Sequence, residues 1–192
     1  MPNEDITIAT LEQAFSVYFD EMERCRRGEC YWALLHVIVT LPDICAALES
    51  DDGRTSGPKY MSWCDRFTPT DIMNGADWWE VRCLVLHQGR TKTRDGRFYK
   101  FIKPTAAARV HQTVWGSRDT IALDVAEMSN EMIKSIRAWF QYLQGPYIED
   151  VRANVKKNLG SLVIVREAEL PGISGVSFTA THTATGNRIK PL

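Results

Sequence analysis

The strongest chemical signal in this sequence is an arginine followed five positions later by a histidine, Arg82 and His87 in the segment RCLVLHQG. Histidine accepts and donates protons near neutral pH, and arginine presents a planar, permanently charged group that stabilises phosphoryl oxygens. Such a pair could cut RNA without a metal, by helping the 2′-hydroxyl attack the adjacent phosphate. The alternative is structural: the arginine would satisfy backbone or acidic groups, and the histidine would cap a helix C-terminus.

Both side chains belong to one predicted helix, which is capped by Asn74 or Asp77 and stops at Gly89. Five positions along an ideal α-helix leave Arg82 and His87 about 140° and 7.5 Å apart, so they do not share a face. One subunit is therefore a poor active site unless the helix end unwinds near His87. A two-fold dimer would bring both pairs together, and we expect a homodimer whose interface includes this tryptophan-containing helix.

Charge is concentrated in the segment that contains and follows this pair. The whole chain has a net charge of −1, but residues 82–118 carry nine Lys or Arg and one acid, Asp95, a net charge of +8. A concentrated positive field attracts polyanions, whereas a solvated basic loop that balances the acidic N-terminal region is the alternative. The candidate RNA-binding residues alternate with aromatic residues that could stack on bases; they are Arg90, Lys92, Arg94, Arg97, Lys100 and Lys103.

The elements around the pair are mostly helical. Apolar residues three and four positions apart predict helices over about 6–25, 30–49, 59–67, 74–88, 125–144 and 147–159. Between them, residues 90–124 read as a small antiparallel β insertion of three or four strands, with Asp95-Gly96 as a hairpin turn. We expect a mainly α domain over residues 1–159 and a C-terminal β hairpin or arm over 160–192. His111 and His182 fall on predicted strands and are expected at the surface.

Composition is that of a folded domain, with 192 residues, 44% hydrophobic and 24% charged. We find no apolar run near 18 residues and no signal peptide, and expect a cytoplasmic protein that does not enter a membrane. The cysteines are odd in number, five, and no second pair completes a zinc ligand set, so reduced, buried thiols are expected. Phosphate-binding glycine motifs are missing as well, and we predict neither a metal nor a cofactor.

The segments YWALLHVIVTLPDIC and VRCLVLHQGR resemble the HEPN superfamily of helical domains, whose nucleases carry an arginine and, after four to six residues, a histidine. They look closest to a group of uncharacterised bacterial proteins placed near that superfamily, over roughly residues 10–145. The resemblance implies a helical bundle and a dimeric, metal-independent endoribonuclease of toxin or defence type, with Arg82 and His87 as catalytic residues. It also implies an antitoxin partner or a neighbouring nucleotidyltransferase.

The chain departs from that superfamily at one position in the motif. Nuclease members often have a polar residue directly after the arginine, where this chain has Cys83. The alternative is therefore a catalytically silent HEPN-like dimer that acts as a binding module for nucleic acid, a nucleotide or a protein.

Overall fold

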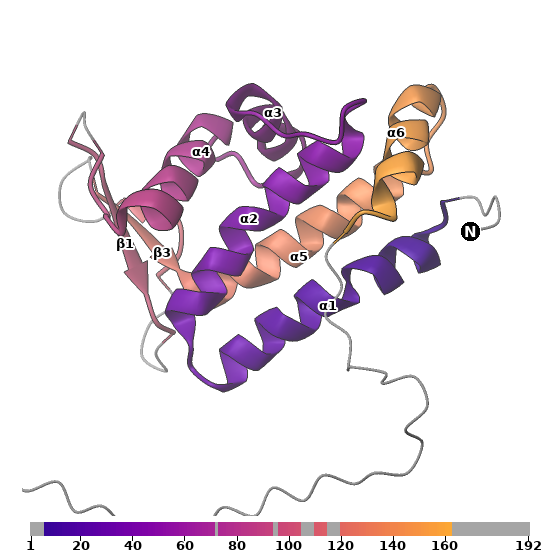
Figure 1. Ribbon diagram of the computed structural model, residues 1–192. Helices are drawn as coiled ribbons and strands as arrows, with labels where there is room; N and C mark the ends of the chain where they lie inside the picture. The colour runs from indigo at the N-terminus through magenta and orange to yellow at the C-terminus, as the bar shows by residue number, and fades with distance from the viewer. Residues whose placement is uncertain (1–5, 72, 94–95, 105–109, 115–119, 163–192) are drawn as a thin grey trace, which may run out of the picture.

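The computed structural model describes residues 6–71, 73–93, 96–104, 110–114 and 120–162. Helices dominate this part of the chain, as predicted, and a small sheet lies at one end of the helical bundle (Figure 1). The helices are α1 (Ile8–Arg27), α2 (Tyr31–Glu49), α3 (Gly57–Phe67), α4 (Gly75–Cys83), α5 (Val125–Tyr142) and α6 (Glu149–Leu159), with a π-helical turn, η1 (Leu84–Gln88), continuing α4. Their ends lie within about two residues of the predicted ones, except that the predicted helix over 74–88 is divided between α4 and η1.

The centre of the bundle is α2, which packs against α1, α5 and α3 (Figure 1). Although the sequence analysis found no such stretch, α2 is long and apolar enough, by length and composition alone, to cross a membrane. Of that apolar stretch, 56% is buried inside the bundle, which is typical of the core helix of a folded domain. Asp43 and Glu49 are its only acidic residues, and both make ion pairs.

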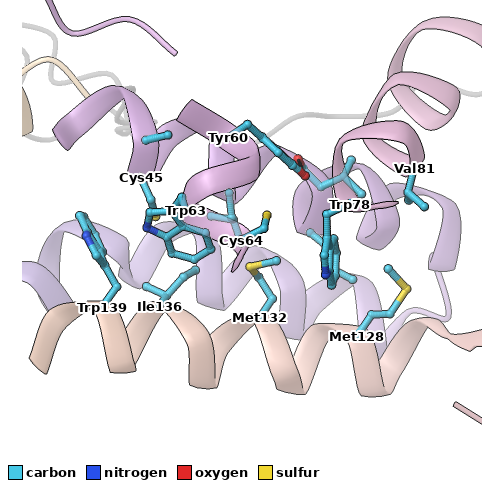
Figure 2. Close-up of a cluster of buried hydrophobic side chains, with 14 of the residues drawn as sticks. Cys45, Tyr60, Trp63, Cys64, Trp78, Val81, Met128, Met132, Ile136 and Trp139 are labelled. Carbon is cyan, nitrogen blue, oxygen red and sulfur yellow. Dashed lines mark hydrogen bonds between the residues drawn. The ribbon is translucent and has the colours of Figure 1, made fainter. Parts of the chain in front are cut away.

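Large side chains from α3, α4 and α5 fill the core above α5 (Figure 2). Met128, Met132 and Ile136 recur every four residues along α5 and point toward Trp63 of α3 and Trp78 of α4. Trp63 has no exposed surface, and Trp78 is 1% exposed. A core residue of this kind cannot anchor a dimer interface, so Trp78 gives no support to the predicted one.

The sheet is mixed, and the prediction of an antiparallel insertion was wrong. It contains β1 (Phe98–Ile102), β2 (Thr113–Val114) and β3 (Thr120–Asp124) in the order β1-β3-β2, with β1 parallel and β2 antiparallel to β3. Four consecutive residues of β3, from Ile121 to Asp124, are buried. This strand therefore takes the central place, and the chain must cross from one side of it to the other between β1 and β2.

Part of the predicted hairpin is present beside β1. Lys92 and Phe98 form an antiparallel bridge, and the amide of Tyr99 donates to the carbonyl of Thr91. Gly96 has a φ of 99°, a value that only glycine adopts without strain. Arg94 and Asp95 lie outside the described residues. So do residues 163–192, and with them His182 and nearly all of the predicted C-terminal arm.

Candidate functional site

Local sequence determines where α4 begins and where the π turn ends. The Asn74 side chain accepts a hydrogen bond from the Asp77 amide, and the Asp77 carboxylate accepts one from the Asn74 amide, which together form a capping box. At the other end, Gly89 has a φ of 58°, and its amide donates to the carbonyl of Leu84, five residues earlier. The last turn is thus wider than an α-helical turn and stops at a left-handed glycine.

The π turn brings Arg82 and His87 together within one chain. Arg82 Nη1 lies 2.6 Å from His87 Nε2. The angle of 140° expected for an ideal α-helix does not apply, because the π turn after Cys83 has i→i+5 hydrogen bonds and more residues per turn, which brings His87 round toward the side of Arg82. The unwinding near His87 that the single-chain site requires is present, and a composite dimeric site is no longer needed to unite the pair.

The direction of this hydrogen bond follows from the chemistry of the two groups. A guanidinium can only donate, so Nε2 of His87 accepts and the ring proton of that tautomer lies on Nδ1. His87 is solvent-exposed, whereas the Arg82 side chain is only 18% exposed. The site therefore combines a solvent-exposed imidazole, that of His87, with a mostly buried guanidinium, that of Arg82.

Asp43 of α2 and Trp79 of α4 hold that cation. Arg82 Nε donates to Asp43 Oδ2 at 2.8 Å, and the guanidinium carbon lies 5.0 Å from the centre of the Trp79 ring. Burial by itself would lower the pKa of Arg82, but the hydrogen bond and the charge of Asp43 raise it above its ordinary value. Arg82 is thus a permanent cation in a defined orientation.

Sequence reasoning missed the role of Asp43, which is 39 positions before its partner. The Asp43 side chain is 11% exposed, and its Oδ1 has no hydrogen-bond partner among the described residues. A buried carboxylate with one unsatisfied oxygen is costly, and such groups are usually paired for a reason. A signal was available: Asp43 is the one charged residue between Tyr31 and Leu48, in an otherwise apolar helix.

A pocket of about 830 Å³ lies beside His87, on α4, η1 and the segment that follows them, and Arg82 is not among the residues that line it. His87, Cys83 and Glu80 contribute to it from the helix, and Arg90 and Lys92 from the segment beyond Gly89. Both of these basic residues are exposed. The pocket wall thus carries two exposed cations and the His87 imidazole, together with one carboxylate, that of Glu80.

The other candidate RNA-binding residues do not join this pocket. Lys103 pairs with Glu29 at 2.6 Å, Lys100 is exposed on β1, and Arg94 lies outside the described residues. Arg97 is an ion-pair partner of Asp77, whose side chain is 8% exposed. Within the basic segment, Arg90 and Lys92 line the pocket, whereas Arg97 and Lys103 form ion pairs with acidic residues elsewhere.

Arg97 belongs to a structural cluster that joins the sheet to α4. The Tyr99 hydroxyl donates to Asp77 Oδ1 at 3.0 Å, the same oxygen to which Arg97 donates. Burial raises the pKa of Tyr99 well above its usual value, the hydrogen bond with Arg97 lowers it, and Asp77 raises it again. The cluster fixes β1, and with it the segment 90–93, relative to the start of α4.

Among His111 and the five cysteines, Cys83 alone is a lining residue of this pocket in the described part of the chain. The prediction that His111 is at the surface was wrong: its side chain is 14% exposed, contacts Glu131 at 2.9 Å and accepts from the Asp124 amide. Cys25, Cys45 and Cys64 are buried and free, as expected, but Cys30 is exposed.

A comparison with protein-family models found no match to this chain. No curated protein and no solved structure matched it either.

Proposed function

We propose that the protein is a metal-independent endoribonuclease that cuts RNA at the Arg82–His87 site. The observation that carries this proposal is the 2.6 Å contact between Arg82 Nη1 and His87 Nε2 at the edge of the basic pocket. The pair supplies a proton acceptor and a fixed cation, the two groups that transesterification at a phosphate needs.

The reaction proceeds in one displacement. RNA phosphate binds Arg82, with Arg90 and Lys92 holding neighbouring phosphates, and competes with His87 for the guanidinium. His87 Nε2, released from Arg82, accepts the proton of the 2′-hydroxyl as its oxygen attacks phosphorus. The bond from phosphorus to the 5′-oxygen breaks, this oxygen takes a proton from water, and protonated His87 returns its proton to the solvent. The products are a 2′,3′-cyclic phosphate and a 5′-hydroxyl end.

Membership of the HEPN superfamily is part of this proposal. It is supported by the helical bundle and by the arginine-to-histidine spacing at the end of α4. The proposal includes a homodimer and a toxin or defence role with an antitoxin or a neighbouring nucleotidyltransferase, as the resemblance implies, and a cytoplasmic location, as expected from the sequence. None of these properties requires a site shared between two chains, because each chain has its own Arg82–His87 contact.

One observation favours the silent binding module as a second candidate. The lone pair of His87 Nε2 is occupied by Arg82, and Cys83 stands where nucleases often have a polar residue. If substrate does not displace this contact, the same pocket binds a polyanion without cutting it.

The deciding experiment incubates the purified full chain with end-labelled RNA in EDTA between pH 6 and 8. We expect cleavage that ends in 2′,3′-cyclic phosphates, and its loss in both His87→Ala and Arg82→Ala. His36→Ala is the matched control, because His36 lies on α2 and bonds the carbonyl of Trp32, not the pocket. It should cut at the wild-type rate.

The outcomes separate the two candidates. Intact RNA together with salt-sensitive RNA binding supports the silent module. Cleavage that requires Mg²⁺ and persists in His87→Ala contradicts the proposed mechanism altogether.

A further inference from the structure

Two of the five cysteines lie close together where α1 ends and α2 begins. Cys25 is in the last turns of α1 and is 7% exposed, and Cys30 is the exposed N-cap residue of α2. Cys45 and Cys64 have no exposed surface. Cys30 is thus the most accessible thiol in the described part of the chain, and its nearest cysteine in sequence is Cys25.

Backbone geometry brings these two residues within disulfide range. The Cys30 amide donates to the Cys25 carbonyl oxygen at 2.8 Å. With standard bond lengths on either side of that hydrogen bond, the two Cα atoms are at most about 6.7 Å apart. Disulfides span Cα separations of roughly 4.4–6.8 Å, so a bridge requires no large backbone movement.

A bridge requires one side chain, that of Cys25, to turn. Cys30 Sγ lies over the turn, 3.4 Å from the carbonyl oxygen of Gly28. Cys25 Sγ makes only a long contact, 3.9 Å, with Glu21 Oε1, and a χ1 rotation would turn it toward Cys30. Burial, then the charge of Glu21 and the neighbouring Cys30, raise the pKa of Cys25.

We propose that Cys25 and Cys30 are a redox-active pair that forms a reversible disulfide on exposure to a hydroperoxide. The Cys30 thiolate attacks the peroxide, the O–O bond breaks, and Cys30 becomes a sulfenic acid as one water leaves. Cys25 then loses its proton and attacks the Cys30 sulfur, the S–O bond breaks, and a second water leaves. Two thiols and one hydrogen peroxide thus give one disulfide and two waters, and a dithiol reductant reverses the reaction.

The raised pKa of Cys25 slows the second step, in which Cys25 attacks the sulfenic acid. A thiol reacts as its thiolate, so Cys25 resolves the sulfenic acid slowly at neutral pH and faster at higher pH. The finished bridge closes a six-residue ring around the turn and fastens α1 to α2. This device is separate from the Arg82–His87 site and does not depend on RNA cleavage.

The test treats the native full chain with a small excess of hydrogen peroxide, blocks the remaining thiols and maps the peptides by mass spectrometry. We expect a Cys25–Cys30 bridge within one chain, a melting temperature higher by a few degrees, and reversal of both by dithiothreitol. Cys83→Ser, the control, should form the same bridge. In Cys25→Ser, dimedone should trap the sulfenic acid on Cys30.

Cys30→Ser keeps the exposed position polar and should fold normally, which circular dichroism checks. In this variant Cys25 should remain a thiol. The proposal is wrong if oxidised wild-type protein carries a free Cys25 beside an over-oxidised Cys30, or if Cys30 bridges to a second chain or to another cysteine.

Discussion

Replacing Asp43 by asparagine should separate the positioning of Arg82 from the mere presence of Arg82. Asparagine keeps the shape of the side chain and one acceptor oxygen, but it removes the charge that faces Arg82 Nε at 2.8 Å. Removing one partner of a fully buried ion pair costs about 3–5 kcal/mol. Here the two side chains keep 18% and 11% exposure, and asparagine retains a hydrogen bond. We therefore expect a loss of about 1–2 kcal/mol, or roughly 2–8 °C in melting temperature.

The effect on cleavage should be larger than this loss of stability suggests. Arg82 is held from two sides by Asp43 and Trp79, and a guanidinium released from one of them no longer meets the phosphate in a single orientation. Misplacement by about 1 Å can cost roughly 100-fold in rate. We expect single-turnover cleavage in EDTA, measured well below the melting temperature, to fall by about 10- to 100-fold.

Glu49→Gln is the matched control for this prediction. Glu49 also lies on α2, is 14% exposed, pairs with Arg66 and accepts from Trp139 Nε1 at 2.8 Å. Its loss should lower the melting temperature comparably and leave the cleavage rate within about twofold. The reasoning is refuted if Asp43→Asn cuts RNA at the wild-type rate, or if Glu49→Gln is equally impaired. An NMR spectrum of the His87 ring nitrogens adds a readout independent of catalysis, because the Nε2 signal should shift only in Asp43→Asn.

Two further predictions concern the basic segment and the cluster behind it. Neutralising Arg90 and Lys92 together should weaken RNA binding and lower the salt slope of binding by about 1.4, roughly 0.7 for each phosphate contact. Lys103→Ala is the control, because Lys103 is already paired with Glu29. In the same titration it should change the slope by less than half of the value for one contact. Tyr99→Phe should destabilise the protein by about 1 kcal/mol near neutral pH, because Asp77 loses a hydrogen bond. Since the folded pKa of Tyr99 is raised, its contribution is fully present below the unfolded pKa of about 10 and is lost as pH rises above it, so the gap between wild type and variant in chemical denaturation should close at high pH. A gap that stays constant up to pH 11 contradicts the assignment.

Local patterns in the sequence were sufficient for the helices and for naming the candidate pair. The helical stripes, the Asn74 cap and the Gly89 stop each depend on residues within one or two turns of one another, so they can be read without knowing the fold. Arg82 and His87 were singled out by residue type and spacing together with their place at the end of a predicted helix, directly before the basic segment, and by the resemblance to the HEPN superfamily.

The strand order and the roles of the basic residues could not be read from local patterns. β3 is the central strand, and residues on both of its faces are buried. Burial on both faces depends on how the sheet packs against the helical bundle, which local sequence patterns do not show. In the sequence, Arg97 and Lys103 cannot be told apart from Arg90 and Lys92. In the fold, Arg97 forms an ion pair with Asp77, and Lys103 forms one with Glu29.

The geometry of the candidate site was likewise decided by tertiary structure. A π turn is rarely favoured by sequence alone, because its wider backbone must be compensated by packing and side-chain contacts. The contacts that hold Arg82 before this turn are also tertiary: Asp43 reaches it across 39 positions of chain, and the Trp79 ring lies 5.0 Å from its guanidinium carbon. The sequence by itself predicted which two side chains to consider as a pair, and the tertiary structure, with α4 and η1 packed against α2, brings these two side chains into contact within one chain.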